Sequence, residues 1–242
     1  RGRALSRLER YEEAVASLRQ AIAIEDDHSG DSFELGNSYV ALERFEDAVR
    51  AFDRTLELDP SNADAYLNKA YALEHLGNDA GTLAALNRYI AINPDLADAW
   101  YHKGLMEVKT GKDGDAVVSF ERTHQLDPKN AGALRSGGEA LTRLSRDAEA
   151  VRLFDAALEL LPSSAEIVSE KAHALVRLER YEEAISAFGT LSGLSPDLPG
   201  PHCLRGDCFV RLGKYSDAVL SFGECIRRDP GNVPALFARG TS

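Results

Sequence analysis

The stretch LGNSYVALERFEDAVRAFDRTLELDP, residues 35–60, carries the pattern that decides the fold. Gly36 comes 24 positions before Pro60, and Ala48 and Phe52 come twelve and eight positions before it. Apolar residues here are three or four positions apart, which predicts helices because one helical turn takes about 3.6 residues. The proline follows the second helix, where its missing N–H disturbs least. The stretch therefore predicts two helices joined by a short turn.

The same pattern returns every 34 residues along the chain of 242 residues. Six of the nine prolines lie on this spacing: Pro60, Pro94, Pro128, Pro162, Pro196 and Pro230. The small-residue position is filled by Gly36, Ala70, Gly104, Gly138, Ala172 and Gly206. A fixed period of this length indicates a stacked array of helix pairs, in which small residues let the two helices approach closely.

We expect six full repeats, 29–62, 63–96, 97–130, 131–164, 165–198 and 199–232, between partial repeats at 1–28 and 233–242. In the repeat 63–96 the helices are predicted near 63–76 and 80–92. Turn glycines such as Gly77 suit the left-handed residue that ends a helix. The predicted fold class is therefore all-α, with residues 1–242 forming a single array of antiparallel helix pairs.

We call each set of positions that recurs every 34 residues a column. These columns resemble those of the tetratricopeptide repeat (TPR) family. The family pattern W-x2-L-G-x2-Y…A-x3-F…P is nearly met by Leu35, Gly36, Tyr39, Ala48, Phe52 and Pro60, with Ser32 in the tryptophan place. Trp100, Gly104, Ala116, Phe120 and Pro128 match it again, with Lys103 and Glu107 as departures. The resemblance covers the whole chain. It implies a right-handed superhelical solenoid whose concave surface, lined by the first helix of each pair, receives a peptide or a partner's helix.

First-helix residues outside the packing columns are the candidate ligand contacts: Phe33, Asn37, Asn68, Tyr71, His75, Tyr101, His102, Lys109, Arg135, Arg143, Arg177 and Arg211. Five of them form one cationic column with a spacing of 34: His75, Lys109, Arg143, Arg177 and Arg211. Such a stripe suits acidic side chains or a terminal carboxylate. The alternative is a solvated row of cations that favours the helix dipole at the end of each first helix.

Chaperone-binding members of the family hold a terminal carboxylate with a clamp of lysine, asparagine and arginine. Asn37 and Asn68 match the two asparagines, but Phe33, Asp98 and His102 stand in the places of the cations. Asp98 would repel a carboxylate, so we exclude capture of a chaperone tail. The two amides retain the ability to bond a peptide backbone, with solvent-facing amides as the alternative.

The chain has 28 Lys+Arg and 39 Asp+Glu, which gives a formal charge of −11. This balance argues against binding to nucleic acid or to an anionic membrane, because both require excess positive charge. It also disfavours RNA binding in the manner of pentatricopeptide arrays. No apolar run approaches the roughly 20 residues that span a bilayer, and no basic-then-apolar leader is present. We expect a cytoplasmic protein.

Cys203, Cys208 and Cys225 are an odd number, which argues against a disulfide framework and fits a reducing compartment. Cys208 and Cys225 fall at small-residue packing positions, so we expect buried structural cysteines. The six histidines never stand four apart on one helix, and no catalytic set or phosphate-binding loop stands out. We therefore expect no metal, no cofactor and no catalytic residue.

The predicted function is that of a non-catalytic interaction module, which binds a peptide or partner segment along the concave face. An acidic partner is one option. The alternative is the substrate-recognition arm of a larger enzyme, such as a glycosyltransferase, whose catalytic domain lies outside the fragment that Arg1 begins. The end helices lack cover, so we also expect end-to-end self-association through 1–28 and 233–242.

Several residues depart from the columns. Glu107 stands where other repeats have leucine or phenylalanine, and we expect it to take a partner or reach solvent. Asp79, Asp113 and Asp147 are predicted to cap the second helices. The glycines of 189–201 predict the place where the array opens most easily, since glycine weakens a helix.

Overall fold

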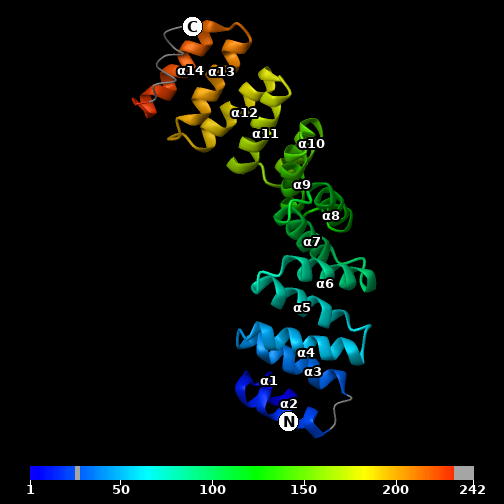
Figure 1. Ribbon diagram of the computed structural model, residues 1–242. Coiled ribbons are helices and arrows are strands. Elements are labelled where there is room, and N and C mark those ends of the chain that lie inside the picture. The colour runs from blue at the N-terminus through cyan, green and yellow to red at the C-terminus, as the bar shows by residue number, and fades with distance from the viewer. Residues whose placement is uncertain (25–27, 232–242) are drawn as a thin grey trace. The chain divides into compact units, whose positions relative to one another are not determined.

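The computed structural model describes residues 1–24 and 28–231, and every regular element in these ranges is an α-helix (Figure 1). The helices are α1 (Gly2–Arg7), α2 (Tyr11–Ile24), α3 (Ser29–Ala41), α4 (Phe45–Leu58), α5 (Ala63–His75), α6 (Asp79–Ile92), α7 (Ala97–Lys109), α8 (Asp113–Leu126), α9 (Ala131–Arg143), α10 (Asp147–Leu160), α11 (Ala165–Arg177), α12 (Tyr181–Leu194), α13 (Gly200–Arg211) and α14 (Tyr215–Arg228). The all-α class is confirmed. The segment 233–242, which we expected to self-associate, lies outside the described residues.

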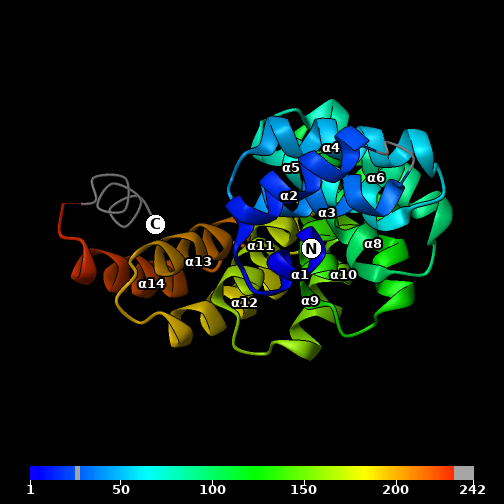
Figure 2. The same ribbon diagram turned by 90° about the horizontal axis from the view of Figure 1, so that it is seen from below.

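The chain forms two compact units: an N-terminal unit, Arg1–Lys112, and a C-terminal unit, Asp113–Ser242. Within each unit every helix packs on the next along the chain. In the N-terminal unit α3 also contacts both α1 and α5, and in the C-terminal unit α9 contacts α11. Figures 1 and 2 both show α13 and α14 side by side. This packing of consecutive helix pairs is that of a TPR solenoid, while the single array over 1–242 stays a prediction.

The small-residue column is fixed by the close approach of paired helices. A Cβ on Gly36 would lie 2.5 Å from Cε1 of Phe52, and one on Gly138 would lie 2.5 Å from Cε1 of Phe154. Both phenylalanine side chains are fully buried. The ring of the second helix therefore occupies the space that any larger residue on the first helix would need.

The turn between paired helices needs a left-handed residue, but the residue need not be glycine. Gly77 has a φ of +70°, as expected for a helix-ending glycine. At the equivalent turns Glu43, Ser145 and Glu179 have φ values of 55°, 59° and 58°. At the Glu43 turn, two backbone hydrogen bonds stabilise this conformation. The amides of Glu43 and Arg44 donate to carbonyl oxygens of α3.

The predicted caps on the second helices were wrong. Asn78 is the N-cap of α6, and its Oδ1 accepts from the Gly81 amide at 2.9 Å. Asp79 is instead the first residue of that helix. In the same way Arg146 is the N-cap of α10 and Asp147 is its first residue. The side chains of these aspartates are thus available for contacts with another repeat.

The prediction against a disulfide was also wrong. Cys203 of α13 and Cys225 of α14 are joined in a disulfide, with a Cα–Cα distance of 5.3 Å. A count of cysteines could not reveal this pairing, because the helix pair brings together residues that are 22 positions apart. Cys208 is free and buried as expected, and burial raises the pKa of its thiol to about 11.

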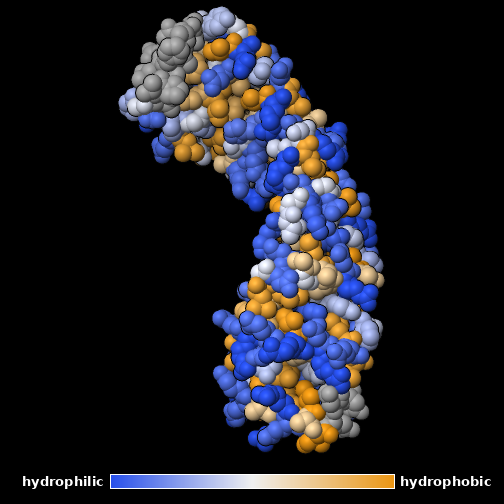
Figure 3. Space-filling model, viewed as in Figure 1, coloured by the Kyte–Doolittle hydropathy of each residue, from blue (hydrophilic) through white to orange (hydrophobic). Residues whose placement is uncertain are grey.

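The surface is mixed in character. On the face drawn in Figure 3, hydrophilic and hydrophobic residues are intermingled over both units. Among the described residues, no helix has the length and apolar character that crossing a membrane requires.

Candidate peptide-binding surface

The N-terminal unit has an apolar pocket of about 370 Å³ between α5 and α7, with α6 also contributing to its lining; we call it the α5–α7 pocket. Three predicted contact residues line it: Asn68, Tyr71 and His102. Buried Ala70, Leu86 and Ala99 also line it. Tyr71 is 49% exposed, which is unusual for so large a ring on a packed helix. An apolar pocket with a few polar groups is the usual form of a ligand site.

An amide pair joins α3 to α5 beside this pocket. Nδ2 of Asn68 donates to Oδ1 of Asn37 at 2.8 Å. Each asparagine carries two donor hydrogens and an acceptor oxygen, so one bond uses only part of their capacity. The structure thus brings together the two amides that the sequence singled out, and each retains polar groups for a further partner.

Three aromatic rings cluster where α4 begins and α5 ends. The centroids of Phe45 and His75 are 4.4 Å apart with an angle of 7° between the rings, which is a stacked pair. Tyr71 meets His75 edge-on at 4.5 Å. His75 belongs to the predicted cationic column, but here its ring packs against aromatic neighbours. The Tyr71 ring of this cluster also lines the α5–α7 pocket.

The next three members of the cationic column form ion pairs with the preceding repeat. Lys109 Nζ lies 2.6 Å from Asp79 Oδ1, Arg143 Nε lies 2.7 Å from Asp113 Oδ1, and Arg177 Nη2 lies 2.7 Å from Asp147 Oδ1. Each pair joins the end of a first helix to the start of the second helix 30 positions earlier. We call each such contact a rung; Phe45–His75 is the aromatic rung at the equivalent position.

The last rung differs from the others. Tyr181 stands where Asp147 stands one repeat earlier, and Arg211 is the cation opposite. Both residues line a pocket of about 570 Å³ in the C-terminal unit. Asp207 lines the same pocket, and burial raises its pKa above the ordinary value although Arg211 opposes the shift.

Arg135 is held by carboxylates rather than open to a ligand. Its Nε lies 3.3 Å from Glu139 Oε1, and it also pairs with Glu166 of α11. Burial raises the pKa of nearby Glu170 to about 8, and the charge and hydrogen bond of Glu139 add to the shift while Arg135 opposes it. Glu139, Glu166 and Glu170 thus surround Arg135 between α9 and α11, and we expect this cluster to titrate near neutral pH.

The other predicted contacts have mixed positions. Phe33 packs on Phe52 of the core, with ring centroids 6.0 Å apart. Tyr101 lies against His102, with centroids 6.2 Å apart. Glu107 is 5% exposed and its Oε1 lies 3.6 Å from Lys103 Nζ, which confirms that it takes a partner. Within the described ranges, no group of three or more histidine, cysteine or acidic side chains is arranged to hold a metal ion.

Comparison with known proteins agrees with these features. Tetratricopeptide repeat models match residues 1–28, 33–97 and 169–233. A comparison with curated proteins gives no match.

Among solved structures, the protein MamA is 25% identical, with a TM-score of 0.61 over 68% of this chain and 96% of that one. YrrB, a TPR protein described as having an unusual peptide-binding site, is 21% identical, with a TM-score of 0.67 over 80% and 100% of the two chains. The C-terminal part of a TPR protein from Cytophaga hutchinsonii is 14% identical, with a TM-score of 0.75 over 98% and 97%. With the helix pairs and the matched repeats together, this chain belongs to the tetratricopeptide repeat family.

Proposed function

We propose that this chain is a non-catalytic interaction module and that its N-terminal unit binds an extended peptide across α3, α5 and α7. The observation that carries the proposal is the half-exposed ring of Tyr71 at an apolar pocket with an amide pair beside it. The pocket would take one apolar side chain of the peptide. The amides of Asn37 and Asn68 would bond its backbone.

The proposed peptide has an apolar anchor and is not acidic near it. Glu74 and Asp98 both line the α5–α7 pocket, and both would repel a carboxylate. Lys109, the cation of this unit's ionic rung, is already paired with Asp79. We therefore expect peptides with a large apolar residue flanked by neutral or basic residues. Such binding should depend weakly on salt, because few charges would be neutralised.

The family and one relative support a peptide ligand. TPR proteins are generally interaction scaffolds. The peptide-binding site of YrrB shows that an array of this fold can hold a peptide. The fold alone is shared with YrrB, so the residues named above rest on the geometry of this chain.

A peptide library screened against the purified chain at two salt concentrations tests the proposal. For the best peptide, Tyr71→Ala and Asn68→Ala should each weaken binding at least tenfold in a fluorescence anisotropy titration. Tyr215→Ala is the matched control, because that ring is 53% exposed but belongs to the C-terminal unit. Binding that survives both N-terminal variants, or that Tyr215→Ala weakens equally, would overturn the proposal.

A further inference from the structure

The disulfide of the C-terminal unit joins a buried residue to a partly exposed one. Cys203 of α13 is bonded to Cys225 of α14, 22 positions later. Cys225 is fully buried, in a cluster with Ala218 and Phe222. Every fully buried member of this cluster lies on α14, whereas Cys203 and the other members from α13 are only partly buried. The bond therefore links the core of the helix pair to a position on α13 that solvent reaches.

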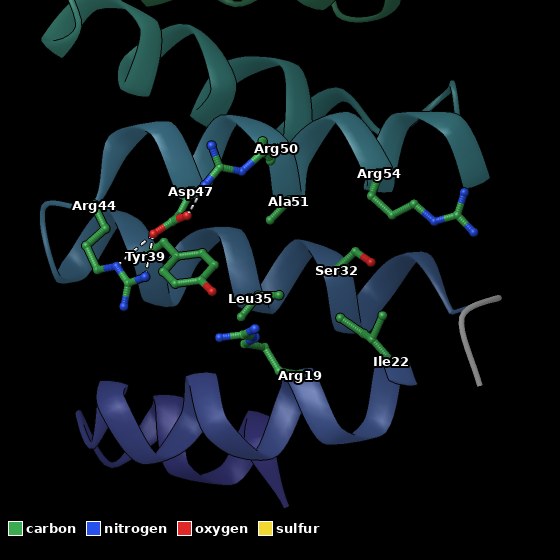
Figure 4. A pocket seen from close by; sticks show the side chains of 10 residues that line it. All are labelled: Arg19, Ile22, Ser32, Leu35, Tyr39, Arg44, Asp47, Arg50, Ala51 and Arg54. Carbon is green, nitrogen blue, oxygen red and sulfur yellow. Dashed lines mark hydrogen bonds and ion pairs between the residues drawn. The ribbon is translucent and has the colours of Figure 1, made fainter. Parts of the chain in front are cut away.

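Other helix pairs of the chain have no cysteines at the equivalent positions. In the other full repeats that lie within one unit, these positions hold Phe33 and Thr55, Leu67 and Tyr89, Arg135 and Ala157, and Ser169 and Leu191. The second residue of each pair is buried, as Cys225 is. In the α3–α4 pair, part of which Figure 4 shows, the guanidinium of Arg44 lies 4.7 Å from the centroid of the Tyr39 ring, a noncovalent contact. A helix pair of this array thus folds without a covalent bond, and the disulfide is an addition to it.

Several features of α13 weaken it on its own. Its N-cap is Pro199, which makes no side-chain hydrogen bond to the helix, and Gly200 and Pro201 follow. His202 is 5% exposed, and neither of its ring nitrogens has a hydrogen-bond partner among the described residues. A buried polar group without a partner is unfavourable. Towards α12, Tyr181 stands where an ionic rung would have its aspartate. We therefore expect α13 to depend strongly on the disulfide.

The bond is open to thiol–disulfide exchange from one side. Because Cys225 is fully buried and Cys203 is partly exposed, a thiolate from solution reaches the Cys203 sulfur. A new bond forms to Cys203 Sγ, the bond to Cys225 breaks, and the electron pair left on Cys225 Sγ takes a proton from water. A second thiolate then displaces Cys203, which is protonated in turn. Two small thiols are thereby oxidised to one disulfide, and the protein disulfide is reduced to two thiols.

Cys208 takes no part in this exchange. It is five positions after Cys203 on the same helix, which places it about 140° around the helix from it. Its side chain is buried, and burial raises the pKa of its thiol to about 11, so the thiol stays protonated near neutral pH. It therefore serves as an internal control for the other two cysteines.

We propose that the Cys203–Cys225 disulfide is a reversible clasp, which a low-molecular-weight thiol opens so that α13 separates from α14 while α9 and α10 stay folded. Opening stays local because each repeat of an array contacts only its neighbours. The clasp also controls a pocket, since α13 supplies Leu204, Asp207 and Arg211 to the pocket of about 570 Å³ in the C-terminal unit. That pocket loses a wall when α13 separates. This proposal does not rest on the peptide site of the N-terminal unit.

The test compares the full chain in two redox states. One sample is incubated with glutathione disulfide and the other with dithiothreitol; after removal of these reagents, a portion of each is denatured and alkylated with N-ethylmaleimide. Mass spectrometry should count one alkylated cysteine in the oxidised sample and three in the reduced one. Hydrogen exchange of the native samples should be at least about tenfold faster across α13 and α14 after reduction, because a lost cross-link of this loop length allows changes on the order of a hundredfold. Exchange in α9 and α10 should stay the same. Three alkylated cysteines in the oxidised sample, or equal exchange of α13 and α14 in both states, would overturn the proposal.

Two variants separate the bond from the residues that form it. Cys225→Ala and Cys203→Ser introduce the residues that Ala157 and Ser169 provide at equivalent positions, so the fold accepts both side chains. Each variant should exchange at the rate of the reduced chain, with or without dithiothreitol. Cys208→Ala is the matched control, since alanine holds the equivalent position one repeat earlier, and it should keep the redox response. A response that survives Cys225→Ala, or that Cys208→Ala abolishes, would rule out this pair as the clasp.

Discussion

The N-terminal and C-terminal units share one set of packing columns but differ in how neighbouring repeats meet outside them. In the N-terminal unit α3 and α5 are joined by the Asn37–Asn68 amide bond, and α4 and α5 by the aromatic rung of Phe45 and His75, beside one ionic rung between Lys109 and Asp79. In the C-terminal unit the rungs at Arg143 and Arg177 are ionic, and carboxylates surround Arg135. The fold therefore requires only the small and apolar columns. The residues outside these columns, which form the contacts between repeats, determine how each unit responds to salt, to pH and to a ligand.

The largest expected effect comes from breaking the columns in one unit at a time. Phe52→Ala and Phe154→Ala should each cost about 3–5 kcal/mol, because each removes a fully buried ring. In a repeat array each repeat contacts only its neighbours, so the loss should stay within the unit that carries the change. Hydrogen exchange measured by mass spectrometry should show lost protection in one unit only. Equal loss in both units from either variant would contradict this independence.

The columns were predictable from the sequence because they are local. The period of 34, the glycine–phenylalanine contacts and the helices of 63–96 follow from spacing within one repeat, and α5 and α6 begin and end within a residue or so of the predicted limits. The TPR family was recognisable for the same reason. The apolar lining of the α5–α7 pocket was only partly predictable, through Asn68, Tyr71 and His102.

Contacts between repeats could not be predicted in this way. The aspartate column and the cation column were both visible, but each has a physical explanation of its own, as a cap or as a dipole partner. Only the packing of one repeat on the next shows that they face each other across 30 positions. The Cys203–Cys225 disulfide and the partner of Arg135 were missed because they also depend on distances between helices.

The second effect concerns pH and should appear in the C-terminal unit alone. Glu170 has a pKa of about 8 in the folded chain, above the ordinary value of 4.5. Between these values the folded state holds a proton that the unfolded state has lost. The free energy of unfolding should therefore fall as pH rises from about 4.5 to about 8, by at most on the order of 1 kcal/mol per pH unit for one proton.

Glu170→Gln removes this proton linkage. Denaturant unfolding of the variant, followed between pH 5 and pH 8, should give a flatter profile than the unchanged chain, with the gain in stability largest at pH 8. Glu182→Gln is the control, since that carboxylate is exposed at the start of α12. A wild-type profile that rises over this range, or that Glu170→Gln leaves unchanged, would contradict the assignment.

The third prediction compares the two kinds of rung. Phe45→Ala should cost about 1–2 kcal/mol, since it loses a stacked ring and part of its packing on the core. Asp147→Ala should cost about 1 kcal/mol or less, because Arg177 is partly exposed and solvent screens the pair. Only the second loss should shrink as salt is raised from about 0.05 to about 1 M, by the ordinary screening of charges. Thermal unfolding at both salt concentrations separates the cases, and a salt-dependent loss for Phe45→Ala would contradict the aromatic assignment.

The smallest expected effect comes from a substitution that stabilises one unit. Gly189 lies inside α12, and a Cβ added there would meet no atom of the described residues within 4 Å. Gly189→Ala should therefore stabilise the C-terminal unit by about 0.5–1 kcal/mol, because alanine loses less backbone freedom in a helix. Hydrogen exchange should slow in α12 and leave α3–α5 unchanged. Gly138→Ala is the contrasting variant: the same added methyl would meet the Phe154 ring at 2.5 Å, so it should destabilise the unit that Gly189→Ala stabilises. If both substitutions stabilise, the close approach of α9 and α10 does not constrain the small-residue column.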